Sequence, residues 1–209
     1  MRTRWIQMVI LLAGLAALCS AAVYAQTDVA ASIYGAFNGT TTGNDTIQSP
    51  SNAAGGLLEV RHIAKPWVGY EGTYAFNRAN QVYTAAVVPL SCPVGGPCGP
   101  VPATVSANAH EVTGDWIASV KVSTLRPFAL AGGGILFDAP VGGQASTTTT
   151  TKPIFVYGAG VDWRLVPHIG LRLQYRGNLY KAPDLTTLFT STNAFTHTAE
   201  PMIGVYFRL

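Results

Sequence analysis

Hydrophobic and polar residues alternate one by one along much of the chain. The segment IGLRLQYRGN (169–178) places polar side chains at Arg172, Gln174 and Arg176 and apolar side chains between them. A period of two predicts a β-strand with one polar and one apolar face. The apolar face of such a strand points to the core of a soluble sheet, or to lipid in a membrane barrel.

Short breaks and long polar connections divide the chain into eight such segments. Pro66, Pro127 and Pro167 each fall in a break between two alternating runs, and these breaks predict three tight turns because proline is excluded from the middle of a sheet. The long connections are 38–52, 77–106, 138–152 and 181–194. Strands are therefore expected at 27–37, 53–63, 67–77, 107–122, 128–138, 153–164, 169–180 and 195–209.

Strand length and composition favour a membrane barrel over a soluble calycin-like barrel, which would hold an apolar cavity and turn its polar face outward. Most of the strands can cross a bilayer at a tilt. Only 11% of the 209 residues are charged, against roughly 25% in soluble domains. The expected fold is all-β: an eight-stranded antiparallel transmembrane up-and-down β-barrel with short periplasmic turns and long extracellular loops.

Residues 1–25 have the pattern of a secretory signal peptide. Arg2 and Arg4 precede a short apolar run, and small residues precede a cleavage site before Gln26. A retained anchor and a lipoprotein acylated at Cys19 are the alternatives. The apolar run is shorter than the roughly 20 residues of a spanning helix, and a bulky leucine precedes Cys19, so a cleaved signal is favoured.

The mature chain, 26–209, is expected to form one barrel domain without a metal or cofactor. Without Arg2 and Arg4 it retains 11 of the 13 Lys and Arg residues against 10 Asp and Glu, a balance that does not indicate a nucleic-acid partner. Cys92 and Cys98 flank a Pro/Gly-rich loop, and in an exported protein this predicts a disulfide. The four scattered histidines do not form a zinc motif.

Charged residues within the strands lie mostly on one face, and this face is predicted to line the barrel. The acids are Glu59, Glu71, Glu111, Asp115, Asp162 and Glu200, and the bases are Arg61, Lys121, Arg164, Arg172, Arg176 and Arg208. The interior of an eight-stranded barrel is about wide enough for side chains to fill it. Paired charges would therefore plug it, while ion-pair exchange that opens a narrow path is the alternative.

The chain resembles the small outer-membrane beta-barrel family that includes the transmembrane domain of OmpA and the opacity proteins. The resemblance rests on the signal peptide, the alternating strands, the glycine-rich segments PFALAGGGILF and VYGAGVDWR, and the terminal strand PMIGVYFRL. It implies residence in the outer membrane of a Gram-negative-type bacterium, contact with outer-membrane lipid, and insertion by the barrel-assembly machinery. The family usually ends in an aromatic residue, whereas this chain has Leu209 with Phe207 two residues before it. The peptidoglycan-binding domain of full-length OmpA is not expected.

Some barrels of this kind modify lipid A, using a His and a Ser side by side on the lipid-facing surface. The nearest candidates here are His197 with Thr198 and Glu200, and His110 with Glu111. Neither gives His and Ser two positions apart on one face, because position 199 is alanine. The sequence therefore predicts a protein without catalytic activity.

The long loops are the remaining candidate for function. The segments TTTGNDTIQSPSN (40–52), GGQASTTTTTK (142–152) and TTLFTSTNAFTHT (186–198) suit polar recognition on a rigid scaffold, or are solvated mobile loops. The 77–106 connection contains NQVYTAAVVPL (80–90), which predicts that its hairpin extends above the membrane. With its tip stiffened by the predicted disulfide, this is the loop favoured to bind a partner. A structural or surface-interaction protein with an extracellular ligand is the favoured function. A narrow porin-like channel for ions or small solutes is the alternative, ahead of a lipid A-modifying enzyme.

Overall fold

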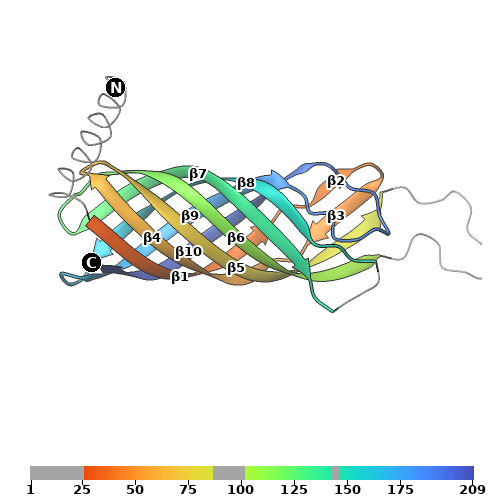
Figure 1. Ribbon diagram of the computed structural model, residues 1–209, viewed down its shortest axis with the longest axis horizontal. Helices are drawn as coiled ribbons and strands as arrows, with labels where there is room; N and C mark the ends of the chain where they lie inside the picture. The colour runs from red at the N-terminus through yellow and green to blue at the C-terminus, as the bar shows by residue number, and fades with distance from the viewer. Residues whose placement is uncertain (1–25, 87–101, 143–145) are drawn as a thin grey trace, which may run out of the picture.

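The computed structural model is a long, narrow β-barrel that describes residues 26–86, 102–142 and 146–209 (Figure 1). Its strands are β1 (Gln26–Asn38), β2 (Thr41–Gly43), β3 (Thr46–Pro50), β4 (Ala53–Lys65), β5 (Val68–Ala85), β6 (Ala103–Ser119), β7 (Leu125–Pro140), β8 (Thr150–Arg164), β9 (Ile169–Lys181) and β10 (Phe195–Arg208). In the described ranges, no helix is long and apolar enough to cross a membrane.

Eight of these strands close into an antiparallel ring, which confirms the predicted fold class. The ring follows chain order, with β2 and β3 outside it, and the β1–β10 pairing closes it. A path that follows paired residues from strand to strand around the ring starts at Asp28 on β1 and passes through Arg61 and Glu71. It returns to β1 at Asn38, ten residues further along. A stagger of this kind accompanies strands that tilt by roughly 35–45° against the barrel axis.

The two ends of the barrel differ in construction. At one end, here called the terminal end, β1 begins, β10 finishes, and the turns 66–67, 120–124 and 165–168 connect neighbouring strands (Figure 1). At the opposite, loop end, β5 and β6 continue as a paired ribbon up to Tyr83 and Ala103. The β2–β3 hairpin adds to the other edge of β5, with Thr46 opposite Ala85. The extension of the 77–106 hairpin is therefore present in the fold.

Two local expectations differ from the structure. The turn between β6 and β7 lies at 120–124, and Pro127 is the third residue of β7, where a strand tolerates proline near its start. The β2–β3 hairpin was not expected, because its two strands are shorter than the windows in which alternation can be recognised. Its turn places Asn44 and Asp45 at positive φ, a conformation that these residues tolerate well.

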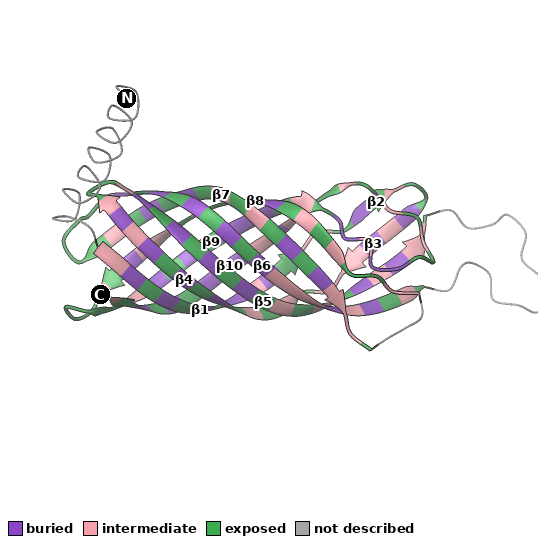
Figure 2. Ribbon diagram, viewed as in Figure 1, coloured by how far each residue is buried: buried purple, intermediate pink, exposed green. Residues whose placement is uncertain are grey.

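Burial alternates along most of each long strand, so the strands have a buried face and an exposed face (Figure 2). On β6, for example, Glu111, Thr113 and Asp115 are buried, while Val112 and Trp116 are 50% and 69% exposed. A soluble sheet would show the opposite arrangement. The polar face therefore lines the barrel, and a band of large apolar side chains forms its outer surface.

Candidate functional site in the barrel interior

Two arginines on opposite sides of the ring share the same carboxylates. Arg61 on β4 lies 3.1 Å from Glu59, 2.7 Å from Glu71 and 3.3 Å from Asp162. Arg172 on β9 contacts Glu59 and donates two hydrogen bonds to Asp162, at 2.6 and 2.9 Å. All five side chains are almost completely buried. Because Glu59 and Asp162 each bind both guanidinium groups, this cluster, here called the paired-arginine cluster, ties the neighbouring strands β4 and β5 to the neighbouring strands β8 and β9.

A second cluster surrounds Arg176, also on β9. Its guanidinium lies 3.0 Å from Glu111 and 3.7 Å from Asp115, and it donates a hydrogen bond to the hydroxyl of Thr113 at 3.1 Å. The Thr113 hydroxyl in turn donates to Asp115 at 2.9 Å, and the Asn178 amide donates to Glu111 at 2.9 Å. The charged groups of this cluster, Glu111, Asp115 and Arg176, all belong to the predicted interior set, and Thr113 and Asn178 complete their hydrogen bonding.

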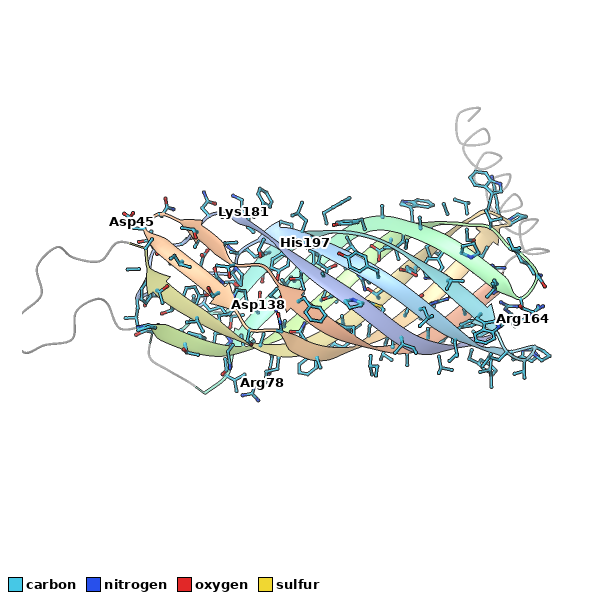
Figure 3. The ribbon with its side chains drawn as sticks, turned by 180° about the vertical axis from the view of Figure 1, so that it is seen from behind. Asp45, Arg78, Asp138, Arg164, Lys181 and His197 are labelled. Carbon is cyan, nitrogen blue, oxygen red and sulfur yellow. The ribbon has the colours of Figure 1, made fainter. Side chains whose placement is uncertain are left out.

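At the terminal end the charges are less enclosed. Arg208 is half-buried and lies 3.4 Å from the buried Asp28, and Arg126 donates to Gln26 at 3.1 Å. Arg164 is half-buried at the same end (Figure 3). The expectation that Lys121 lines the interior is wrong. Lys121 is exposed because β6 ends at Ser119, so strand alternation no longer decides which way the side chain points.

The interior is therefore more acidic than the expected balance of six acids and six bases. The six expected acids are all buried, but only Arg61, Arg172 and Arg176 are fully buried among the bases. Two further acids, Asp28 and Asp138, are also buried. Both have the inward phase of their strands, but their nearest inward neighbours are uncharged, so these faces did not look charged in the sequence.

The segment 182–194 folds across the loop end and forms a cap. Tyr83 on the extended part of β5 donates a hydrogen bond to the carbonyl of Pro183 at 2.8 Å and accepts one from the Leu185 amide at 3.1 Å. The Gln48 amide of β3 donates to the same Pro183 carbonyl at 3.0 Å. Burial raises the pKa of the Tyr83 hydroxyl above its usual value, so the hydroxyl keeps its proton and remains a donor.

Neighbouring loops hold this cap from the sides. The Asn44 amide donates to the Ser191 carbonyl at 2.7 Å, and Lys152 pairs with Asp184 at 3.0 Å. The Thr148 amide donates to the Leu185 carbonyl at 3.1 Å. The described parts of the polar loops are thus packed against one another, in contrast to the alternative of simply solvated loops.

Small spaces remain between the described interior side chains. A cavity of about 30 Å³ lies beneath the cap among residues that include Glu111, Asp138 and Glu200. Another, of about 10 Å³, lies at the terminal end between Arg126, Asp162 and neighbouring side chains. One water-sized sphere takes roughly 10–15 Å³. These cavities can each hold about one or two waters.

Comparison with known proteins decides the family. The sequence matches the family of the outer membrane protein beta-barrel domain over residues 10–205. The chain belongs to this family. It is accordingly a protein of the outer membrane, and the expected family and localisation are confirmed. No curated protein matches the sequence.

Two solved structures show the same fold at low sequence identity. Neisserial surface protein A is 14% identical with a TM-score of 0.50, over 87% of this chain and 96% of its own. OprG from Pseudomonas aeruginosa is 9% identical with a TM-score of 0.60, over 88% of this chain and 96% of its own. Both similarities concern the fold alone.

In an outer-membrane barrel, the exposed apolar band faces lipid, and the histidines lie on this outer surface. His110 accepts or donates a hydrogen bond with the Tyr74 hydroxyl at 2.8 Å, and His197 does so with the Tyr157 hydroxyl at 2.9 Å. At the terminal end, His62 packs against Tyr70 at 5.2 Å between ring centroids and His168 against Phe207 at 6.0 Å. Tyrosine and histidine on the outer surface suit the boundary between lipid and water.

The residues considered for lipid A chemistry do not come together on this outer-membrane barrel. His197 points outward, whereas its neighbours Thr198 and Glu200 are buried inside. His110 likewise lies on the face opposite to Glu111. Cys92 and Cys98, and the predicted signal peptide, lie outside the described residues. Among the described residues, no group of three His, Cys, Asp or Glu side chains could hold a metal ion.

Proposed function

We propose that this protein is a closed, non-catalytic outer-membrane barrel that acts as a structural or surface-interaction protein through its loop end. The terminal end would face the periplasm and the cap would face the outside of the cell. Insertion by the barrel-assembly machinery, a cleaved signal peptide and a disulfide between Cys92 and Cys98 belong to the same proposal.

The paired-arginine cluster is the observation that supports a closed interior. Its five charged side chains bridge β4, β5, β8 and β9, and they are almost inaccessible to water. The cap adds a second obstruction at the loop end. An ion would have to displace both, at the cost of separating buried opposite charges.

Conductance of the refolded mature protein in a planar lipid bilayer tests this proposal. We expect no steady conductance from the wild type, and leakage from Arg172→Ala or Glu71→Ala, because each removes one side of the charge pairing. The Lys121→Ala variant is the matched control, since Lys121 is exposed outside the strands. Steady wild-type conductance that changes in both cluster variants would overturn the closed barrel.

A narrow channel is the second candidate, and the shared carboxylates favour it. Glu59 and Asp162 each contact two arginines, so one pairing could be exchanged for another without leaving a charge unpaired. Brief, voltage-dependent openings in the same recordings would support this function over a permanently closed barrel.

The absence of catalysis can be tested separately in cells. The outward His197 shares a hydrogen bond with the Tyr157 hydroxyl on the outer face, whereas Thr198 and Glu200 point inward and cannot serve it. We therefore expect the lipid A mass spectrum to be unchanged when the protein is expressed. A mass shift that disappears in His197→Ala would contradict the non-catalytic proposal.

The packed cap is the surface that we propose for recognition. It is anchored from three sides, and Leu188 at 66% exposure is a large apolar side chain that it presents to solvent. A rigid, polar surface with an exposed apolar residue suits binding to another molecule at the cell surface. Binding of whole cells to a glycan array, with wild type beside Leu188→Ser, would show whether this surface recognises carbohydrate. Equal glycan binding by cells with and without the protein would contradict recognition of carbohydrate by the cap.

A further inference from the structure

The cavity at the terminal end of the barrel has a mainly basic wall. Arg126 on β7, Arg164 on β8 and Arg208 on β10 all have the inward phase of their strands, and all three line this cavity of about 10 Å³. Lys121 borders it from the turn between β6 and β7. Among the described lining residues, Asp162 is the only acid. Four bases therefore meet a single carboxylate in this wall.

This carboxylate already belongs to the paired-arginine cluster. Asp162 stands opposite Arg126 in the β7–β8 register. It accepts two hydrogen bonds from Arg172, at 2.6 and 2.9 Å, and lies 3.3 Å from Arg61. The ion pairs of the described residues join Asp162 to these two arginines and not to Arg126 or Arg164. The bases of the terminal cavity are therefore left without a carboxylate of their own.

Arg126 shows most clearly that an acceptor is missing. Its Nη2 donates to Gln26 at 3.1 Å, but its Nε and Nη1 are buried without a hydrogen-bond partner among the described residues. Arg208 repels this guanidinium electrostatically, whereas Asp28 and Asp162 attract it without forming an ion pair with it. A buried guanidinium with open donors and a cationic neighbour is unfavourable unless an acceptor, best a negatively charged one, reaches it.

The size and chemistry of the cavity favour an oxyanion over water alone. One water-sized sphere takes roughly 10–15 Å³, so a single water could fill the space, but it would supply no negative charge. Guanidinium groups bind phosphate oxygens with their paired N–H donors, and lysine binds them as a point charge. The cavity can accept one oxygen of a phosphate group. The rest of the group would lie at the mouth, where Ser123 and Thr124 are exposed.

Two apolar turns beside the cavity indicate the source of such a phosphate. These turns present four exposed large apolar side chains, Val120, Val122, Leu165 and Val166. Lys121 lies between the first two in the chain, and Arg164 directly precedes the last two. Apolar side chains interleaved with basic ones suit the boundary where acyl chains meet anionic headgroups.

We propose that the mouth of the terminal end binds a phosphate group, supplied by an anionic phospholipid of the surrounding membrane. Arg126 and Arg164 provide the hydrogen-bond donors, Arg208 and Lys121 add positive charge, and the two apolar turns contact the acyl chains. This site goes beyond the proposed function and does not depend on whether the barrel conducts.

Native mass spectrometry of the mature protein, released from maltoside micelles, counts bound lipids directly. Phosphatidylglycerol is titrated, with phosphatidylcholine as the zwitterionic comparison and inorganic phosphate as a competitor. We expect about one phosphatidylglycerol per chain, bound at least about tenfold more tightly than phosphatidylcholine. Arg126→Gln and Arg164→Gln should each weaken this binding by about tenfold, the effect of losing a hydrogen bond to a charged group.

Arg78→Gln is the matched control, because Arg78 is an exposed arginine toward the loop end, whereas Arg164 lies at the terminal end (Figure 3). Its lipid binding should equal that of the wild type. Equal affinity for the two lipids would overturn the proposal, as would binding that survives in both mouth variants or that weakens as much in Arg78→Gln. Binding of inorganic phosphate without the lipid would overturn the lipid source and assign the site to a soluble phosphate.

The result on Arg164→Gln decides the proposal even if Arg126→Gln does not fold. Arg164 is half-buried, and its side chain forms no hydrogen bond or ion pair with a described residue. Its replacement is therefore expected to leave the barrel intact, which circular dichroism of the same sample checks. None of these results depends on bilayer conductance, so this site and the closed barrel can fail independently.

Discussion

The two halves of the barrel interior differ in how their buried charges are paired. Near the paired-arginine cluster, Arg61 and Arg172 hold Glu59 and Asp162 between them, and each acid has a cationic partner. Beneath the cap, Asp138 and Glu200 form no described ion pair with an arginine, and one carboxylate oxygen of each is buried without a hydrogen bond to a described residue. Paired charges of this kind fill space and fix the strands relative to one another, whereas a buried carboxylate oxygen without a hydrogen bond is unfavourable. The first half therefore suits a plug, and the second half tolerates buried acids with fewer partners.

Removing Arg172 should have the largest effect on this contrast. Arg172→Ala leaves Glu59 and Asp162 with Arg61 alone and opens space in the centre of the barrel. We expect the free energy of unfolding to fall by about 3–5 kcal/mol, the usual effect of removing one member of a buried ion pair. Urea unfolding in lipid vesicles, followed by circular dichroism, measures this change. A loss below 1 kcal/mol would mean that water enters the cluster and already screens its charges.

Neutralising a shared carboxylate should cost less. Glu59→Gln keeps the size of the side chain but removes a charge that contacts Arg61 and Arg172. The expected loss in the free energy of unfolding is about 2–3 kcal/mol, in the range of hydrogen bonds to charged groups. Glu71→Gln is the comparison, because Glu71 contacts only Arg61 among the described arginines. The same unfolding series should rank Glu59→Gln as more destabilising, and the reverse order would contradict the bridging role of Glu59.

The same substitutions beneath the cap should have the opposite sign. Asp138→Asn and Glu200→Gln each remove a buried charge that forms no described ion pair with an arginine, and we expect the free energy of unfolding to rise by about 1–2 kcal/mol. Thermal unfolding of both variants beside the wild type measures the difference. Destabilisation of both variants would place these carboxylates with the paired ones.

The sequence predicted the barrel more completely than its charge pairing, and the reason is physical. Period-two alternation is a local property, so the strand carrying Arg172 and Arg176 was predicted at 169–180 and observed at Ile169–Lys181. Pairing depends on the register around the whole ring, which brings Arg61 beside Asp162 across 101 positions of the chain. Asp138 was missed because Leu136, its inward neighbour on β7, is apolar. The cap could not be predicted either, since its contacts join four loops that are distant in the sequence.

The smallest effect should come from the cap itself, where a single hydroxyl connects two elements. Tyr83→Phe removes the hydrogen bonds to the Pro183 carbonyl and from the Leu185 amide, while the ring can keep its stacking on Phe189 at 6.3 Å between centroids. We expect a global loss of about 1 kcal/mol, because Gln48 still donates to Pro183. The local effect should be larger: hydrogen exchange at the Leu185 amide should accelerate by about tenfold, while amides in β9 near Arg172 stay protected. Uniform acceleration at both places would show that the cap and the paired-arginine cluster open as one unit, and the contrast between the two halves of the interior would then not extend to their dynamics.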